Sequence, residues 1–261
     1  MELEPTIISS DDTATFQYLR WWLDQVCHRI AAKFNIYNSK GKPRKAFIID
    51  TLMKYSCPGC IVKALTTHVS HEYVDDIFRE NHRLAVNLLV ERLRQRLTVN
   101  GSKSAYAYVQ GEVPGEYGRV DVLVKPISCG VLVKLKNVRV IVEVKTGKSF
   151  SYIQLFRYLI QNPNSVIVVW RVKMRQIFVL DGRKMCVRAL LLALMETAIN
   201  RGLYILNMKN EQCSHNPINS KKYEVENPQQ LIDDFTDGLM QTLDHVVNVI
   251  DTIINYDQPA C

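Results

Sequence analysis

The sequence predicts a mixed α/β protein in which a central mixed β-sheet is flanked by helical regions at both ends of the chain. Three observations predict this fold class. Apolar residues recur at steps of three and four in the first and last thirds of the sequence, which is typical of amphipathic helices. Between about residues 105 and 181 the pattern changes to short runs rich in Val, Ile and Tyr. The 261 residues are 47% hydrophobic, which is enough to bury one large core or a core with a smaller helical lobe.

The N-terminal region, residues 1–100, is expected to be helical. Apolar residues spaced by three and four predict a helix over 13–34, with Asp12 as its N-cap. Residues 38–45 (NSKGKPRK) combine Gly, Pro and basic side chains, so we expect an exposed loop that is solvated rather than a DNA clamp. A wide apolar arc predicts a second helix over about 72–97, which should pack on the core. Gly101 follows this helix and should prevent its extension.

The central region, residues 101–182, is expected to hold the sheet and one helix over 151–161. Its strands are predicted from β-branched and aromatic runs at 106–111, 119–125, 131–136, 138–145, 165–172 and 176–180. The C-terminal region, residues 183–261, is again expected to be helical, with helices over 184–200 and 229–254. The last helix is expected to pack on its own domain. The alternative is that its apolar face forms the interface of a homodimer.

The amino-acid composition indicates the cellular compartment and the class of binding partner. Lys and Arg outnumber Asp and Glu by 33 to 26, and this excess favours a polyanionic partner such as DNA. Seven scattered cysteines do not indicate a disulfide framework, so a reducing cytoplasm is expected. The acidic N-terminus does not resemble a signal peptide. The most apolar stretch, 189–195 with its flanks, is shorter than the roughly 18 residues of a membrane span, so no membrane association is expected.

Three charged residues lie within strands that are otherwise aliphatic. Asp121 is in the run RVDVLV, and Glu143 and Lys145 are two apart in VIVEVK. Residues two apart on a strand point to the same face, so Glu143 and Lys145 should emerge side by side. Charges at such positions are costly unless they are paired or bind an ion. Two carboxylates with a backbone carbonyl and waters form the incomplete oxygen shell that Mg²⁺ prefers. The alternative is a surface ion pair on an edge strand, with Asp121 facing a turn.

The order of three motifs resembles the RecB-like branch of the PD-(D/E)XK nuclease superfamily. These motifs are Gly118-Arg-Val-Asp121, Glu143-Val-Lys145-Thr-Gly, and Gln154-Leu-Phe-Arg-Tyr158. The branch includes nuclease domains of bacterial recombination helicase-nucleases and CRISPR-associated adaptation nucleases. The resemblance covers about residues 80–170 and implies a restriction-endonuclease-like core.

The resemblance also implies roles for individual residues. Asp121, Glu143 and the carbonyl of Val144 would bind Mg²⁺ or Mn²⁺, and Lys145 would act in catalysis. Gln154 and Tyr158, four apart on one helical face, would lie beside the site and contact DNA. Lys148 and Arg157 are the further nucleic-acid-binding candidates.

Upstream, the family places a histidine at the start of a helix within reach of the metal, and His82 resembles that residue. Other branches use a glutamate from the same helix, for which Glu91 is the candidate. Nine residues separate the two positions, and at about 100° per residue they lie on roughly opposite sides of the helix. We therefore expect His82, which falls within the apolar arc, to face the site and Glu91 not to do so.

Cys57 and Cys60, in the run CPGC, raise a second metal hypothesis. An iron–sulfur cluster is not expected, because Cys186, Cys213 and Cys261 are too widely spaced to complete four ligands. A zinc site with His68 and His71 has suitable ligand types, but its spacing matches no known motif. We expect buried or incidental thiols.

The sequence therefore predicts a Mg²⁺- or Mn²⁺-dependent deoxyribonuclease that acts in DNA replication, recombination or repair. The rival hypothesis is a nucleic-acid-binding protein that keeps the nuclease fold and does not cut. Endonuclease and exonuclease activity, and the form of DNA that is cut, remain open.

Overall fold

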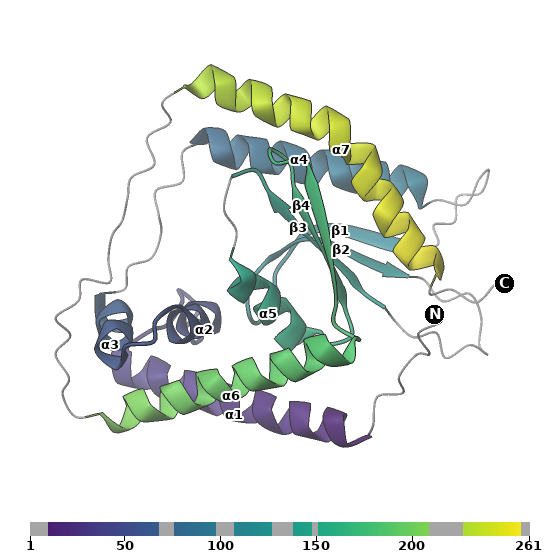
Figure 1. Ribbon diagram of the computed structural model, residues 1–261. Coiled ribbons are helices and arrows are strands. Elements are labelled where there is room, and N and C mark those ends of the chain that lie inside the picture. The colour runs from purple at the N-terminus through teal and green to yellow at the C-terminus, as the bar shows by residue number, and fades with distance from the viewer. Residues whose placement is uncertain are drawn as a thin grey trace. The chain divides into compact units, whose positions relative to one another are not determined.

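The computed structural model describes residues 10–67, 76–97, 107–126, 138–147, 151–208 and 227–256. These residues form seven helices and one five-stranded mixed sheet, so the predicted α/β class with a central sheet flanked by helices is confirmed (Figure 1). The strand predicted over 131–136, the start of the helix predicted over 72–97, and Gly101 lie outside the described residues.

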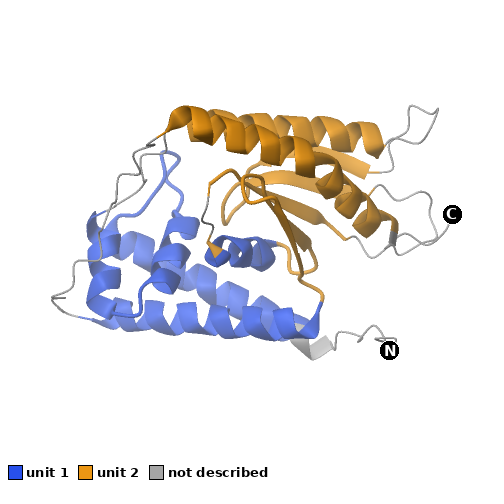
Figure 2. Cartoon of the chain, turned by 45° about the horizontal axis from the view of Figure 1, so that its top comes forward, with its two compact units in different colours: residues 1–72, 152–161, 184–221 blue, residues 73–151, 162–183, 222–261 orange. Residues whose placement is uncertain are grey.

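The chain forms two compact units, and each is built from three separate segments (Figure 2). The first unit, called here the helical unit, comprises residues 1–72, 152–161 and 184–221. The second, called the sheet unit, comprises residues 73–151, 162–183 and 222–261. The units therefore interleave along the chain, whereas the sequence suggested three consecutive regions.

The helical unit contains five described helices: α1 (Ser10–Phe34), α2 (Lys45–Lys54), α3 (Pro58–Thr67), α5 (Tyr152–Gln161) and α6 (Met185–Asn207). Helices α1 and α6 run side by side. Gly202 permits their close approach, because a Cβ at this position would lie 2.2 Å from Cγ1 of Val26. The prediction of Asp12 as an N-cap is wrong, since α1 already begins at Ser10. Helices α2 and α3 were not predicted, because their apolar residues are less clearly confined to one face than those of α5, which has the same length.

Cationic side chains close the C-terminal ends of two helices in this unit. The ammonium of Lys33 donates to the carbonyls of Ile205, Leu206 and Met208 at 3.0–3.1 Å, at the end of α6. The guanidinium of Arg201 donates to the carbonyls of Leu52 and Tyr55, at the end of α2. The last carbonyls of a helix have no partner within the helix and carry partial negative charge, so both contacts stabilise the ends.

The sheet unit is built on strands in the order β1-β2-β3-β4-β5. The strands are β1 (Ala107–Val113), β2 (Val120–Pro126), β3 (Val140–Lys145), β4 (Val166–Arg171) and β5 (Gln176–Asp181). All neighbouring pairs are antiparallel except β3 and β4, which are parallel. A parallel pair needs a crossover connection, and the segment between these two strands contains α5.

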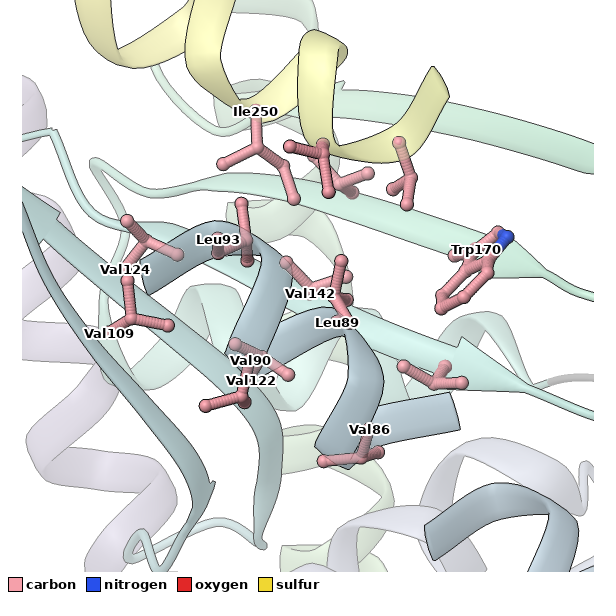
Figure 3. Packing of buried hydrophobic residues seen from close by; sticks show 14 of the residues in the cluster. Val86, Leu89, Val90, Leu93, Val109, Val122, Val124, Val142, Trp170 and Ile250 are labelled. Carbon is pink, nitrogen blue, oxygen red and sulfur yellow. The ribbon is translucent and has the colours of Figure 1, made fainter. Parts of the chain in front are cut away.

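Helices α4 (Asp76–Arg96) and α7 (Pro228–Tyr256) cover one face of this sheet. Leu89 and Leu93 of α4 and Ile250 of α7 pack against Val122 and Val142 (Figure 3). These valines belong to the alternate residues of β2 and β3 that point to this face. Glu143, which lies between Val142 and Val144 on β3, therefore points away from these helices. Helix α4 packs on the sheet as its apolar arc predicts.

Polar contacts fix α7 onto the sheet and onto α4. The indole of Trp170 donates to the hydroxyl of Thr242 at 2.8 Å, which satisfies the one polar atom of this buried side chain. Arg96 of α4 pairs with Asp251 of α7 at 2.9 Å. Gly238 lets α7 approach the chain just after β4, because a Cβ there would lie 2.2 Å from the carbonyl oxygen of Val172.

Helix α6 differs from its prediction in length. It extends to Asn207, seven residues beyond the predicted end. By length and composition it is the one helix in the described part of the chain that could cross a membrane, although core helices of soluble proteins pass the same test. One third of its most apolar 18-residue window is buried inside the protein.

Candidate functional site

The pairing of β2 with β3 brings Asp121 and Glu143 to the same end of the strand pair. The antiparallel register pairs Val122 with Val142 and Val124 with Val140. Asp121 precedes Val122 and Glu143 follows Val142, so both acids lie one residue beyond the last pair of this register. Both carboxylates are buried, with 6% of Asp121 and 1% of Glu143 exposed.

Asp121 is held by a backbone group of the neighbouring strand. Its Oδ2 accepts a hydrogen bond of 2.8 Å from the N–H of Val144. The carbonyl of Lys145 accepts from Val172, on the β4 side of β3. Because successive backbone groups of a strand alternate in direction, the N–H and the carbonyl of Val144 point toward the β2 side, where Asp121 lies. The carbonyl predicted as a metal ligand thus points to the same side of β3 as the Asp121 carboxylate.

His82, near the start of α4, contacts the same carboxylate. Its Nε2 lies 3.2 Å from Oδ2 of Asp121, and 26% of the His82 side chain is exposed. Burial lowers the pKa of His82, but the hydrogen bond that His82 donates to Asp121 and the charges of Asp121 and Glu143 outweigh burial, so the pKa is raised above its ordinary value. Glu91, by contrast, is exposed and accepts a bond of 3.4 Å from Gln95. The choice of His82 over Glu91 agrees with this geometry.

Glu143 and Lys145 form an ion pair between the Lys145 ammonium and Oε1 of Glu143. The carboxylate is almost fully enclosed, whereas 21% of the Lys145 side chain is exposed. The alternative of a surface pair on an edge strand is wrong, because β3 lies in the middle of the sheet with β2 and β4 on either side. The structure therefore brings four predicted residues, His82, Asp121, Glu143 and Lys145, into two adjoining acid–base pairs.

The donors around these pairs fit a hard divalent cation in kind. Two buried carboxylates and a peptide carbonyl supply oxygen ligands, and the imidazole supplies one nitrogen. Each carboxylate already faces one positively charged or protonatable group, which occupies the place where a cation would neutralise it. Within the described residues, no three His, Cys, Asp or Glu side chains are grouped around a common point. Binding a cation would therefore require Glu143 to exchange its lysine partner for the metal.

The second half of the predicted site belongs to the helical unit. Helix α5 begins at Tyr152, seven residues after Lys145 in the chain. The amide of Gln154 donates to the hydroxyl of Tyr158 at 2.7 Å, which confirms that the two share one helical face. Tyr158 is buried and Gln154 is half-buried within this structure.

The two basic candidates for DNA contact have different outcomes. Arg157 is buried, and its Nε lies 2.9 Å from a carboxylate oxygen of Asp50 within the helical unit. Burial raises the pKa of Asp50, and the nearby Arg157 charge opposes this rise. Arg157 thus serves as the partner of a half-buried acid and does not present an open cationic surface. Lys148 lies outside the described residues.

Glu112 is a residue near the site that the sequence did not reveal. The register pairs Gly111 with Val122 and Val113 with Val120, so Glu112 and Asp121 occupy the intervening positions. Glu112 has φ 52°, a left-handed conformation that is uncommon and strained for a residue other than glycine. Its carboxylate accepts a bond of 2.8 Å from Arg119. Residue type does not signal such a backbone conformation, so no sequence pattern would have identified it.

The structure describes Cys57 and Cys60 but not the two histidines of the hypothetical zinc site. Cys57 is half-buried and Cys60 is buried, and both are free thiols. His68, His71, Cys213 and Cys261 lie outside the described residues. The expectation of thiols without a bound metal stays a prediction.

Comparison of the chain with protein-family models, curated proteins and solved structures found no match in any of the three.

Proposed function

We propose that the protein is a Mg²⁺- or Mn²⁺-dependent deoxyribonuclease with a restriction-endonuclease-like core. One observation carries the proposal: two buried carboxylates lie on the neighbouring strands β2 and β3, each one residue beyond the last pair of their register, with His82 and Lys145 as their partners. Burying two acids at adjacent positions has a large desolvation cost, which is offset when the site binds a cation. The motif order of the sequence supports the same assignment.

Asp121 and Glu143 would hold the cation with the carbonyl of Val144, and His82 would complete the protein ligands. When bound, such a cation lowers the pKa of a coordinated water and offsets the negative charge of a phosphate. Val144 orients Asp121 through its N–H before any substrate arrives, because the hydrogen bond fixes the carboxylate against β3.

Lys145 would have two successive partners. In the structure its ammonium neutralises Glu143. With Glu143 serving as a metal ligand, the Lys145 ammonium would be available to orient the attacking water and to offset charge that develops on the scissile phosphate. The partial exposure of the Lys145 side chain is consistent with a group that meets substrate.

The rival hypothesis is a DNA-binding protein with this fold that does not cut. The excess of basic residues supports DNA as a partner under either hypothesis. The buried carboxylate pair favours the nuclease, because a surface that only binds phosphates gains nothing from two enclosed negative charges.

The test is cleavage of linear, circular, single-stranded and branched DNA with Mg²⁺, with Mn²⁺ and with EDTA. We expect metal-dependent cleavage by the wild type, and a fall of about two orders of magnitude or more in Asp121→Asn and Glu143→Gln, which almost preserve side-chain volume. Glu91→Gln, an exposed acid on α4, is the matched control and should cut at the wild-type rate.

Wild-type cleavage that survives both substitutions would place the active site elsewhere. A wild-type protein that binds DNA but cuts none of the four forms with either metal would favour the rival hypothesis.

A further inference from the structure

Helix α1 carries an aromatic cluster on the exposed surface of the helical unit. Tyr18 is 61% exposed and Trp21 is 54% exposed, so both rings are open to a ligand. The rings of Trp21 and Trp22 lie 5.1 Å apart and those of Tyr18 and Trp22 lie 6.4 Å apart, both edge to face. The three rings therefore form one ordered group, and they play no part in the site on β2 and β3.

The exposed face of α1 changes from aromatic to polar and cationic along the helix. At 100° per residue, four residues of α1 fall on one side of the helix: Tyr18, Trp22, Gln25 and Arg29. Gln25 and Arg29 are exposed. From Tyr18 to Arg29 this stripe is about 16 Å long at 1.5 Å per residue.

From Tyr18 to the end of α1 the charges are mostly positive. Arg20, Arg29 and Lys33 stand against one carboxylate, Asp24, which Lys45 at the start of α2 binds at 2.9 Å, whereas Asp11 and Asp12 lie at the beginning of the helix. The same ion pair brings the basic loop over 38–45 back to the middle of α1. In that loop, the carboxamide oxygen of Asn38 accepts from the N–H groups of Lys40 and Lys42 at 2.9 Å, and both lysine side chains are exposed.

The distribution of charge between the units agrees with this local pattern. The helical unit has 15 Lys and Arg against nine Asp and Glu, whereas the sheet unit has 18 against 17. Nearly all of the excess positive charge of the chain is thus in the unit that presents the aromatic cluster.

From these observations we infer that the exposed face of α1 binds single-stranded nucleic acid, with bases stacked on Trp21 and Tyr18 and phosphates near Arg29 and the basic loop. Proteins that hold single strands without sequence preference combine aromatic rings, on which successive bases stack, with cations that follow the backbone. A duplex offers no exposed base faces, so single-stranded DNA is the ligand that this combination fits. The inference does not depend on cleavage at Asp121 and Glu143.

The test is equilibrium binding of the full-length protein to a fluorescein-labelled oligo-dT and to an abasic chain of the same length, in EDTA so that cleavage is excluded. The wild type should bind oligo-dT more tightly than the abasic chain. Trp21→Ala should weaken oligo-dT binding by about 5- to 150-fold, the range expected for one lost stacking contact, and should reduce the preference over the abasic chain by the same factor, because Tyr18 still stacks.

Two variants separate stacking from general disturbance. Trp21→Phe keeps an aromatic ring and should retain most of the wild-type affinity. Tyr204→Ala removes an aromatic residue of α6 that is 53% exposed, and it should bind both chains as the wild type does. Arg29→Ala should weaken binding of both chains alike. It should also lower the slope of log affinity against log salt concentration by about 0.7, the value for one phosphate contact on a single strand.

Equal affinity of the wild type and Trp21→Ala for oligo-dT would overturn the inference. It would also be overturned if sedimentation showed a wild-type dimer that Trp21→Ala dissociates while oligo-dT affinity is unchanged, because the aromatic face would then join two copies of the chain.

Discussion

Replacing Lys145 by alanine probes the proposed cation site through stability as well as through catalysis. The substitution removes the ammonium that pairs with Glu143 and leaves a carboxylate that is 1% exposed without that partner. Breaking a buried ion pair by removing one member costs about 3–5 kcal/mol. Because 21% of the Lys145 side chain is exposed, water can partly replace the ammonium, and we expect the lower end, about 3 kcal/mol.

This loss should appear as a lower melting temperature in the absence of divalent cations. For a protein of this size 1 kcal/mol corresponds to about 2–4 °C, so the melting temperature of Lys145→Ala in EDTA should fall by roughly 6–12 °C. A divalent cation that binds at Asp121 and Glu143 should reverse the loss. At about 100 times its dissociation constant a ligand stabilises the folded state by about 2.7 kcal/mol, which nearly equals the expected deficit.

The assay is thermal unfolding, followed by circular dichroism, of the wild type and Lys145→Ala in EDTA and over a Mn²⁺ series. Mn²⁺ should stabilise the variant more than the wild type, since in the wild type it must first displace the Lys145 ammonium from Glu143. DNA cleavage by the variant should nevertheless be lost, because no cation other than the metal offsets the developing phosphate charge.

Lys173→Ala is the matched control. Lys173 pairs with Asp234 at 2.8 Å, but 35% of the Asp234 side chain is exposed, so removal of Lys173 should lower the melting temperature much less than removal of Lys145. Mn²⁺ should not restore that difference. If Mn²⁺ raised the melting temperatures of Lys145→Ala and Lys173→Ala by the same amount, the link between Lys145, Glu143 and a bound cation would be refuted.

Two further predictions concern packing and pH. Gly238→Ala should lower the free energy of unfolding by about 3 kcal/mol in urea titrations, because its Cβ would overlap the backbone oxygen of Val172. Gly147→Ala is the control. A Cβ at Gly147 would have no atom within 4 Å, so this variant should stay within about 0.5 kcal/mol of the wild type. The raised pKa of His82 means that its charged form stabilises the fold below pH 6.5 and that this contribution is lost as pH rises through the raised pKa. Urea unfolding in EDTA should therefore show a wild-type advantage over His82→Gln at pH 5.5 that shrinks by pH 8.5; a constant difference would mean that the contact with Asp121 is not an ion pair.

Much of the candidate site could be predicted from the sequence because it depends on periodicity. Strand alternation put Glu143 and Lys145 on one face, and helical periodicity separated His82 from Glu91. These are properties of neighbouring residues in one element, and the structure has the same arrangement. The pairing of Asp121 with the N–H of Val144 was not predictable, since it depends on the register between two strands that are distant in the chain.

Local pattern likewise determined the α/β class, the five described strands and the long helices, because hydrophobic spacing over ten or more residues is a strong signal. Helices α2 and α3 were missed although α5, of the same length, was predicted, because their apolar residues are less clearly confined to one face of the helix. Only the tertiary structure decided that the chain divides into two interleaved units and that Arg157 is held by Asp50. It also decided that the Glu143 carboxylate is paired with Lys145 inside the sheet. Each of these outcomes depends on which distant segments meet and on how much water they exclude, and composition and spacing along the chain do not specify either.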